Sequence, residues 1–341
     1  MEDSTYSPVP DLRAPVPVVF IHQHYSFYLE FTLRQARLTN PASPVWLIGD
    51  AENNRFPFAR HTVITSLLSD DYRRFDTMYT HSSPNCEAYE KFCFQRWFLL
   101  RELMHQQQYE VAFMADTDVM LYDQLDRTAR RMLHKKCVAA YNVGADCDWV
   151  NCASGHSSFW TRAGIDQFCA FILKLYEHPD YMPLLAAIRA DDRLNNQWVG
   201  ISDMTALYLF MKQGPERILN LSRCKHNWTF DHNIGTATNY EHHEYSLDHG
   251  YKRVFWIEEK RPVCFNRLRQ QPVQMATLHF QGPTKKYIHR HYTGHDLRWL
   301  KVLREGRLQA THVYHRLVGL RRQVQQRLAD VELLHGLRKS I

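Results

Sequence analysis

The sequence predicts an α/β fold in which helices flank a largely parallel sheet, and two observations support this. Two short runs rich in β-branched and apolar residues, Pro17–Gln23 and Pro44–Asp50, are typical of buried strands. The segment between them carries residues at helical spacing, namely Tyr25, Leu29, Leu33 and Ala36. A strand, a helix and a strand within about 30 residues make a βαβ unit, and such units place ligand sites at the carboxyl ends of parallel strands.

The following segments continue this alternation. "HTVITSL" (61–67) indicates a third strand, and "YEVAFMADTD" (109–118) indicates a central one. A long helix from about Glu87 to Gln107 is expected to pack one face on the core, with Tyr89, Cys93, Trp97, Leu100 and Met104 on that face. Further strands are expected at 137–142 and 157–161, and helices at about 165–176 and 203–211. Residues from about 220 to 281 are expected to be loop-rich with scattered strands.

The composition favours a globular enzyme or binding protein with small anionic ligands. The chain has 341 residues, of which 45% are apolar and 23% charged, so it can bury the core of one large domain or two smaller ones. The formal net charge of +6 is modest for this length. Because Lys and Arg do not cluster in the first 260 residues, the basic stripe of a nucleic-acid binder is missing. We therefore expect no nucleic-acid partner.

The N-terminal lead indicates a cytoplasmic protein. "MEDSTYSPVPDLRAPVP" is acidic and proline-rich and has neither the cationic nor the apolar region of a signal peptide. No apolar run approaches the ~18 residues that a membrane span needs. The eight cysteines form no CxxC pair, so reduced thiols are expected.

A long amphipathic helix is predicted from about Thr311 to Lys339. One side carries the apolar residues Val313, Leu317, Leu320, Val324, Leu328, Val331 and Leu334. The favoured interpretation is a helix docked on its own domain, and the alternative is contact with an anionic membrane surface or a partner helix. The predicted organisation is thus an N-terminal lead (1–16), one α/β domain (17–290) and a basic helical extension (291–341).

Two aspartates lie one residue apart at the end of the expected central strand. In an extended segment, residues i and i+2 point to the same side, so Asp116 and Asp118 are expected to face the crevice at the sheet edge together. Two neighbouring carboxylates repel each other and favour a counter-charge. A hard cation such as Mn²⁺ or Mg²⁺ takes oxygen ligands and shares them with phosphate. The alternative is a strand end whose aspartates cap a turn.

A second motif lies far downstream, in "LHFQGPTKKY". His279, Gly282 and Lys285 have the spacing H-x-x-G-x-x-K. A neutral imidazole can be a third metal ligand, a glycine permits close backbone approach to a phosphate, and a lysine supplies a point charge. On its own, His279 would be interpreted as a hydrogen-bonded loop histidine. Together with the two aspartates, it indicates a site for a metal and a diphosphate.

With these two motifs the chain resembles the retaining glycosyltransferases of the GT-A fold, in particular family 8, the glycogenin and bacterial galactosyltransferase group. The resemblance rests on "ADTDVMLYDQL" and "HFQGPTKKY", where Lys286 and Tyr287 stand in place of the family's Pro-Trp. It covers roughly residues 17–287. It implies an α/β GT-A fold with a mixed, mostly parallel sheet flanked by helices.

The resemblance also implies roles for further residues. Arg96, on the helix before the central strand, would reach the donor, and Ser154 and Gly155 in "NCASGHSSFW" would lie near the donor sugar. Asp203 matches the last acid of the family's D-Q-D helix start, and Ile201 and Ser202 replace the other two positions. It is a candidate for acceptor binding or for stabilising the reacting sugar's positive charge; the alternative is a helix N-cap.

Strand ends near the N-terminus supply the remaining candidates. His22 and Gln23 end the first strand and Asp50 ends the second, so all three are candidates for nucleoside contacts. The alternative for each is ordinary loop polarity.

The function implied by motifs and resemblance is metal-dependent glycosyl transfer with retention. The donor would be a nucleotide-diphosphate sugar, with a UDP-sugar expected, and the acceptor a glycan, a lipid-linked saccharide or a protein. One alternative is a GT-A-shaped binding protein without turnover. Another is a nucleotidyl- or phosphoryl-transferring enzyme, which would carry a Gly-rich phosphate loop near the first strand, where "FIHQHYSFY" has no glycine.

Overall fold

The structure is a computed structural model that describes residues 14–133, 137–146, 153–190, 200–214 and 217–311. The chain divides into two compact units, Met1–Thr293 and Gly294–Ile341. In the second unit a helix spans 298–311. The amphipathic helix expected at 311–339 lies almost entirely outside the described residues. In the described ranges, no helix is both long enough and apolar enough to cross a membrane.

A seven-stranded sheet forms the centre of the first unit, in the order β3-β2-β1-β4-β7-β6-β8. Its strands are β1 Val18–His22, β2 Val45–Gly49, β3 Arg60–Val63, β4 Val111–Ala115, β6 Ala139–Asn142, β7 Ser154–Thr161 and β8 Ile218–Asn220. β3, β2, β1 and β4 are parallel, as are β6 and β8, whereas β7 is antiparallel to β4 and β6. The predicted α/β fold with a mixed, mostly parallel sheet is confirmed.

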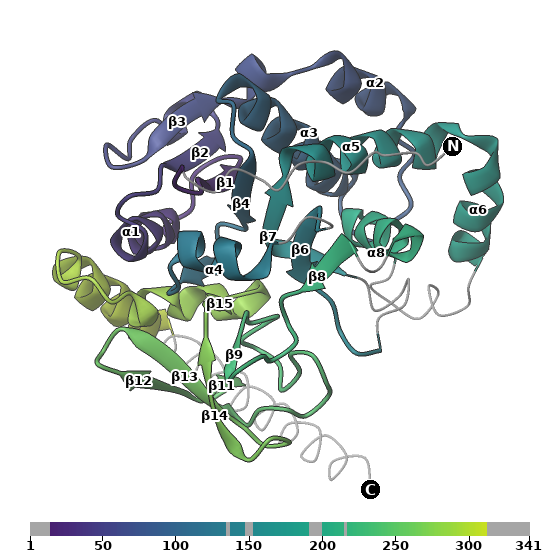
Figure 1. Ribbon diagram of the computed structural model, residues 1–341. Coiled ribbons are helices and arrows are strands. Elements are labelled where there is room, and N and C mark those ends of the chain that lie inside the picture. The colour runs from purple at the N-terminus through teal and green to yellow at the C-terminus, as the bar shows by residue number, and fades with distance from the viewer. Residues whose placement is uncertain (1–13, 134–136, 147–152, 191–199, 215–216, 312–341) are drawn as a thin grey trace, which may run out of the picture. The chain divides into compact units, whose positions relative to one another are not determined.

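Helices cover both faces of this sheet (Figure 1). The α-helices are α1 Leu29–Thr39, α2 Asp70–Met78, α3 Glu87–Gln106, α4 Leu125–Met132, α5 Arg162–Glu177, α6 Met182–Ala190 and α8 Asp203–Gln213. Short 3₁₀ segments are η1 Ala51–Asn53, η2 Ile64–Leu67, η3 Pro179–Tyr181 and η5 Gly282–His291. Alternate residues of β4 pack in two separate hydrophobic cores. Ala112 and Met114 lie in the core that includes residues of α3, α5 and α8. Phe113 and Ala115 lie in the core that includes residues of α1 and α4. The sheet is therefore buried on both faces, as its continuous apolar strands require.

The long helix α3 has the predicted bounds to within one residue. Its buried face is broader than predicted and includes Phe94, Phe98 and Leu103. Tyr89 was wrongly placed on that face, because its side chain is 62% exposed. The helix packs against α2, α5 and α8 as well as β4.

The later part of the first unit contains smaller sheets. The strands β12 Val254–Ile257, β13 Arg261–Asn266, β14 Gln271–Met275 and β9 Trp228–Thr229 form one sheet in that order. β10 Leu247–Asp248 pairs with β11 Tyr251–Lys252, and β15 Thr277–His279 pairs with β5 Val119–Leu121. The last pair is the one that builds the candidate site.

Candidate metal and diphosphate site

The antiparallel pair β5–β15 brings the two motifs together. β5 begins directly after Asp118, β15 ends at His279, and the register sets His279 opposite Val119. The backbone N–H of Phe280 donates to the carbonyl of Asp118 at 2.9 Å. Main-chain hydrogen bonds therefore hold the second aspartate next to the histidine, although the two residues are far apart in sequence.

The two aspartates do not lie in an extended segment, and that part of the prediction was wrong. β4 ends at Ala115 and the chain turns, since the N–H of Val119 donates to the carbonyl of Asp116 at 3.0 Å. The cause is that β5 leaves the large sheet to pair with β15. The turn nevertheless leaves ligand atoms of Asp116, Asp118 and His279 all within 4.8 Å of one another.

Asp118 is a buried carboxylate that lies beside a lysine ammonium and an imidazole. Its side chain is 8% exposed, Lys285 Nζ lies 3.0 Å from Oδ2, and His279 Nε2 lies 3.5 Å from Oδ1. Burial alone would raise the pKa of this carboxyl, but His279 and Lys285 outweigh burial and lower the pKa to about 2. Asp118 is therefore ionised at neutral pH and available to a cation.

His279 presents one defined ring nitrogen to Asp118. Its Nδ1 lies 2.6 Å from the carbonyl oxygen of His232, and because a carbonyl only accepts, Nδ1 carries the hydrogen. In the neutral ring Nε2 then holds the lone pair that a metal needs. Burial lowers the pKa of this imidazole, but Asp118 and Asp116 outweigh burial and raise it. Two carboxylates and an imidazole nitrogen are together ligands for a divalent metal ion.

Arg96 bridges Asp116 to Asp203. Its Nη1 donates to Asp116 Oδ1 at 2.5 Å and its Nη2 donates to Asp203 Oδ2 at 2.7 Å. Trp97 Nε1 donates to the same Oδ2 at 3.0 Å. The alternative that Asp203 caps its helix is wrong, because the N-cap is Ser202, whose hydroxyl accepts from the N–H of Thr205. Asp203, 3% exposed, is instead a buried partner of the arginine.

Ser154 and Gly155 lie at the start of β7 and are both buried. A Cβ atom on Gly155 would approach two ring carbons of Trp97 to 2.4 and 2.7 Å. Glycine at this position therefore makes room for the indole that holds Asp203. The Ser154 hydroxyl lies 2.8 Å from His156 Nδ1, so in the structure it contacts another side chain of the same strand.

The three strand-end candidates near the N-terminus, His22, Gln23 and Asp50, do not all contact the aspartate turn. His22 joins the aspartate turn, since its Nδ1 lies 2.9 Å from the hydroxyl oxygen of Thr117. Burial, with Lys285 nearby, lowers the pKa of this imidazole to about 4. Gln23 is exposed. Asp50 Oδ2 accepts from the backbone N–H of His24 at 2.5 Å, so it fixes the loop that follows β1.

Gly282 and Lys285 lie at the start of η5. Gly282 has φ +59°, in the left-handed region, and a Cβ there would meet nothing within 4 Å. The backbone conformation explains this glycine, and the open space in front of it leaves room for a ligand. Lys285 Nζ contacts Asp118, as given above, and lies 5.6 Å from the centre of the Tyr28 ring.

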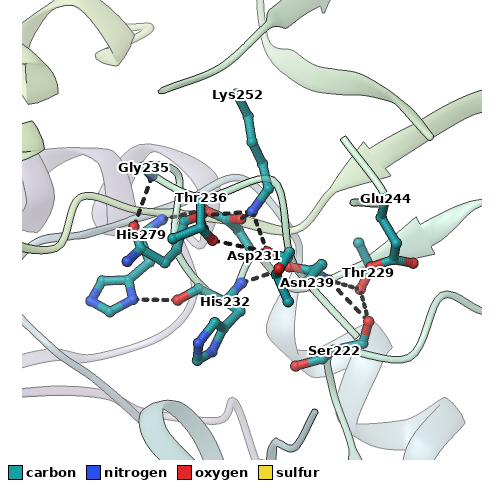
Figure 2. A network of polar contacts seen from close by, with 12 residues as sticks. Ser222, Thr229, Asp231, His232, Gly235, Thr236, Asn239, Glu244, Lys252 and His279 are labelled. Atoms are coloured by element: carbon teal, nitrogen blue, oxygen red, sulfur yellow. Dashed lines mark hydrogen bonds and ion pairs between the residues drawn. The ribbon is translucent and has the colours of Figure 1, made fainter. Parts of the chain in front are cut away.

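A buried polar network behind His279 was not predicted from the sequence (Figure 2). Lys252 Nζ donates to Asp231 Oδ1 at 2.6 Å, and neither side chain is exposed. The ring of His156 stacks on that of His279 at 4.0 Å. One signal was available for Asp231, which directly follows an apolar strand-like run, "WTF". Lys252 has no such signal, since a lysine in a short polar strand is ordinarily exposed.

No protein-family model matches the chain, and no curated protein matches it in sequence. Solved structures to which it is similar include apo mouse xyloside xylosyltransferase 1 (9% identity, 63% of this chain and 87% of that one, TM-score 0.44). Another is apo WbbM, a bifunctional glycosyltransferase (11% identity, 87% of this chain and 52% of that one, TM-score 0.47). A third is galactosyltransferase LgtC with donor and acceptor sugar analogs (10% identity, 85% of this chain and 96% of that one, TM-score 0.41). This chain thus spans about half of the WbbM chain. Because so few residues are shared, the chemistry has to be inferred from the site's own side chains.

Proposed function

We propose that the protein is a metal-dependent glycosyltransferase that moves a sugar from a nucleotide-diphosphate sugar to an acceptor hydroxyl. The observation that carries the proposal is the convergence of Asp116, Asp118 and His279, with Lys285 in contact with the second aspartate. A metal site with an adjacent cation and an open left-handed glycine suits a diphosphate.

Asp116, Asp118 and His279 would hold Mn²⁺ or Mg²⁺. When bound, the ion supplies positive charge against the leaving diphosphate. Lys285 would exchange its contact with Asp118 for one with a phosphate, and Gly282 would let the backbone approach that phosphate. We propose that His22, Gln23 and Asp50 contact the nucleoside of the donor. The contacts of the ion and of Lys285 with the leaving diphosphate would each typically be worth several kcal/mol of transition-state stabilisation.

Arg96 is proposed to act through the carboxylates of Asp116 and Asp203, because one of its terminal nitrogens donates to each of them. Asp203 is the proposed catalytic residue, stabilising positive charge on the reacting sugar, with one of its oxygens held by Arg96 and Trp97. Ser154 and Gly155 are proposed to support the donor site through His156 and Trp97. If the reaction retains configuration, the departing phosphate takes the acceptor proton and no separate carboxylate base is needed.

A UDP-sugar is the proposed donor, and a glycan, a lipid-linked saccharide or a protein is the proposed acceptor. The proposed location is the cytoplasm. Peripheral membrane contact through the basic amphipathic helix expected at 311–339 is a further proposal, on residues almost entirely outside those that the structure describes.

The test is donor turnover by the full chain. Nucleotide sugars are incubated with the protein and Mn²⁺, with and without EDTA, and free nucleoside diphosphate is measured. We expect EDTA-sensitive release with at least one donor. Failure of every donor, together with no nucleoside-diphosphate binding in calorimetry, would reject the proposal. Metal-dependent binding without any release would favour the alternative of a nucleotide-sugar binding protein without turnover.

A further inference from the structure

Lys252 and Asp231 form a fully buried ion pair directly behind His279 (Figure 2). The lysine ammonium has three donors, and all three are used: it donates to Asp231 Oδ1 at 2.6 Å, to the carbonyl of Asn233 at 2.7 Å and to the carbonyl of Thr238 at 3.0 Å. A buried charge is tolerated when it is paired and hydrogen-bonded in this way. The ammonium therefore binds the 231–238 loop at three points along its length.

The same loop sets the hydrogen bonds of His279. Asp231 Oδ2 accepts from the backbone N–H of His279 at 3.0 Å. The carbonyl of His232, which lies between Asp231 and Asn233 in the chain, accepts from His279 Nδ1 at 2.6 Å. Lys252 thus holds the chain on both sides of the carbonyl that decides which ring nitrogen carries the hydrogen.

A second imidazole depends on the same loop. His156 Nε2 donates to the carbonyl of Asp231 at 2.9 Å, and its ring lies parallel to that of His279, with an interplanar angle of 15°. The stacked ring limits the tilt of His279, while the His232 carbonyl limits its rotation. Both constraints originate in the segment that Lys252 binds.

We propose that Lys252 and Asp231 are positioning residues that hold His279 with Nδ1 protonated and Nε2 directed at the metal site. The proposal rests on the proposed function, since it assigns these residues to the same metal. Partners of a metal-bound histidine typically change metal affinity 10–100-fold when they are removed. A purely structural ion pair would affect folding and leave the histidine's ring nitrogens and the metal affinity unchanged.

The test compares the full-length protein with Asp231→Asn/Lys252→Met. The double substitution removes both charges, because one buried charge left without its partner could unfold the chain. The amide oxygen introduced by Asp231→Asn can still accept from the His279 N–H. What the variant removes is the ammonium that binds the carbonyls of Asn233 and Thr238. Lys225→Met is the matched control, since Lys225 is exposed in the same part of the chain. Circular dichroism checks that each variant is folded.

Two readouts are used. Nitrogen NMR of ¹⁵N-histidine protein without metal, at a pH at which the His279 ring is neutral, reports which of its nitrogens is protonated. Mn²⁺ affinity is measured from the paramagnetic resonance of free Mn²⁺. In the double variant we expect a mixture of ring tautomers and Mn²⁺ binding weakened at least tenfold. In Lys225→Met both readouts stay as in the parent.

The outcomes separate this inference from the function on which it rests. A folded double variant that keeps the parent's tautomer and Mn²⁺ affinity overturns the positioning role, whatever the activity. A parent that binds no Mn²⁺ overturns the proposed metal site, and the tautomer spectra then decide the positioning of His279 on their own.

Discussion

His279 Nε2 lies 3.5 Å from Asp118 Oδ1, in a contact produced by the pairing of β5 with β15. The separation is too long for a good hydrogen bond. Two ligands at right angles, each about 2.1 Å from one cation, lie about 3 Å apart. The pair is therefore close to the spacing that a shared ion requires, and a small approach of either side chain completes it.

Asp118→Asn is expected to weaken Mn²⁺ binding at least 100-fold, because it removes the charge from the more buried of the two aspartate ligands. EDTA-sensitive donor turnover should fall with it. Mn²⁺ titration measures the effect, and Asp248→Asn, on an exposed side chain, is the control. Unchanged Mn²⁺ affinity in Asp118→Asn would show that the ligand assignment is wrong.

Lys285→Met is expected to move two affinities in opposite directions. Without nucleotide, the ammonium competes with a cation for Asp118, so its removal should strengthen Mn²⁺ binding several-fold. With Mn²⁺ present, nucleoside-diphosphate binding should weaken about tenfold, because one charge-assisted contact to phosphate is lost. Calorimetry measures both, with the exposed neighbour in Lys286→Met as the control. Equal weakening of both ligands would contradict an exchange of partners by Lys285.

Gly155→Ala is expected to destabilise the protein by about 1–3 kcal/mol, as overpacking typically does. The added methyl group would meet the Trp97 ring at 2.4 Å and displace the indole that holds Asp203. Thermal unfolding measures the change. Gly306→Ala is the control, since a Cβ there meets nothing within 4 Å. A stable Gly155→Ala protein that loses only donor binding would instead favour direct contact of Gly155 with the donor.

Stability is expected to fall as the pH decreases from about 6.5 to 4. Burial, with Lys285 nearby, lowers the pKa of His22 in the folded chain to about 4. In that range the unfolded chain binds a proton at His22 that the folded chain does not, so acid favours unfolding. Because the ring is partly exposed, the effect between pH 7 and 5 is about 1 kcal/mol. Urea unfolding of the parent and of His22→Gln should show a smaller pH dependence in the variant.

Local patterns were sufficient to predict the elements that carry the motifs. The apolar runs that lead to His22 and to Asp116 are β1 and β4. The H-x-x-G-x-x-K motif was expected to share a site with the two aspartates, and in the structure its Lys285 contacts Asp118. The turn at Asp116–Asp118 was missed because apolar residues continue on both sides of it. Nothing in a local window shows that β5 leaves the large sheet for a strand much later in the chain.

The network behind His279 was missed for a different physical reason. Lys252 and Asp231 can both be buried because each neutralises the charge of the other. Whether a charged residue is buried therefore depends on a partner that is distant in sequence. His156 likewise lies in a strand that is buried along its whole length, and no periodic pattern in the sequence marks this histidine. These residues become visible only when the three-dimensional contacts are known.

Arg96→Lys tests whether the arginine acts as a bridge. One ammonium cannot reproduce the fork that donates to Asp116 and Asp203 at 2.5 and 2.7 Å. We expect a loss of about 1–3 kcal/mol in the free energy of unfolding. The loss should shrink in an Asp203→Asn background, because coupled residues are not additive. Arg261→Lys, in an exposed pair with Glu258, should change stability by less than about 0.5 kcal/mol. Urea unfolding of the four-protein cycle gives the coupling energy, and full additivity would show that Arg96 and Asp203 act independently.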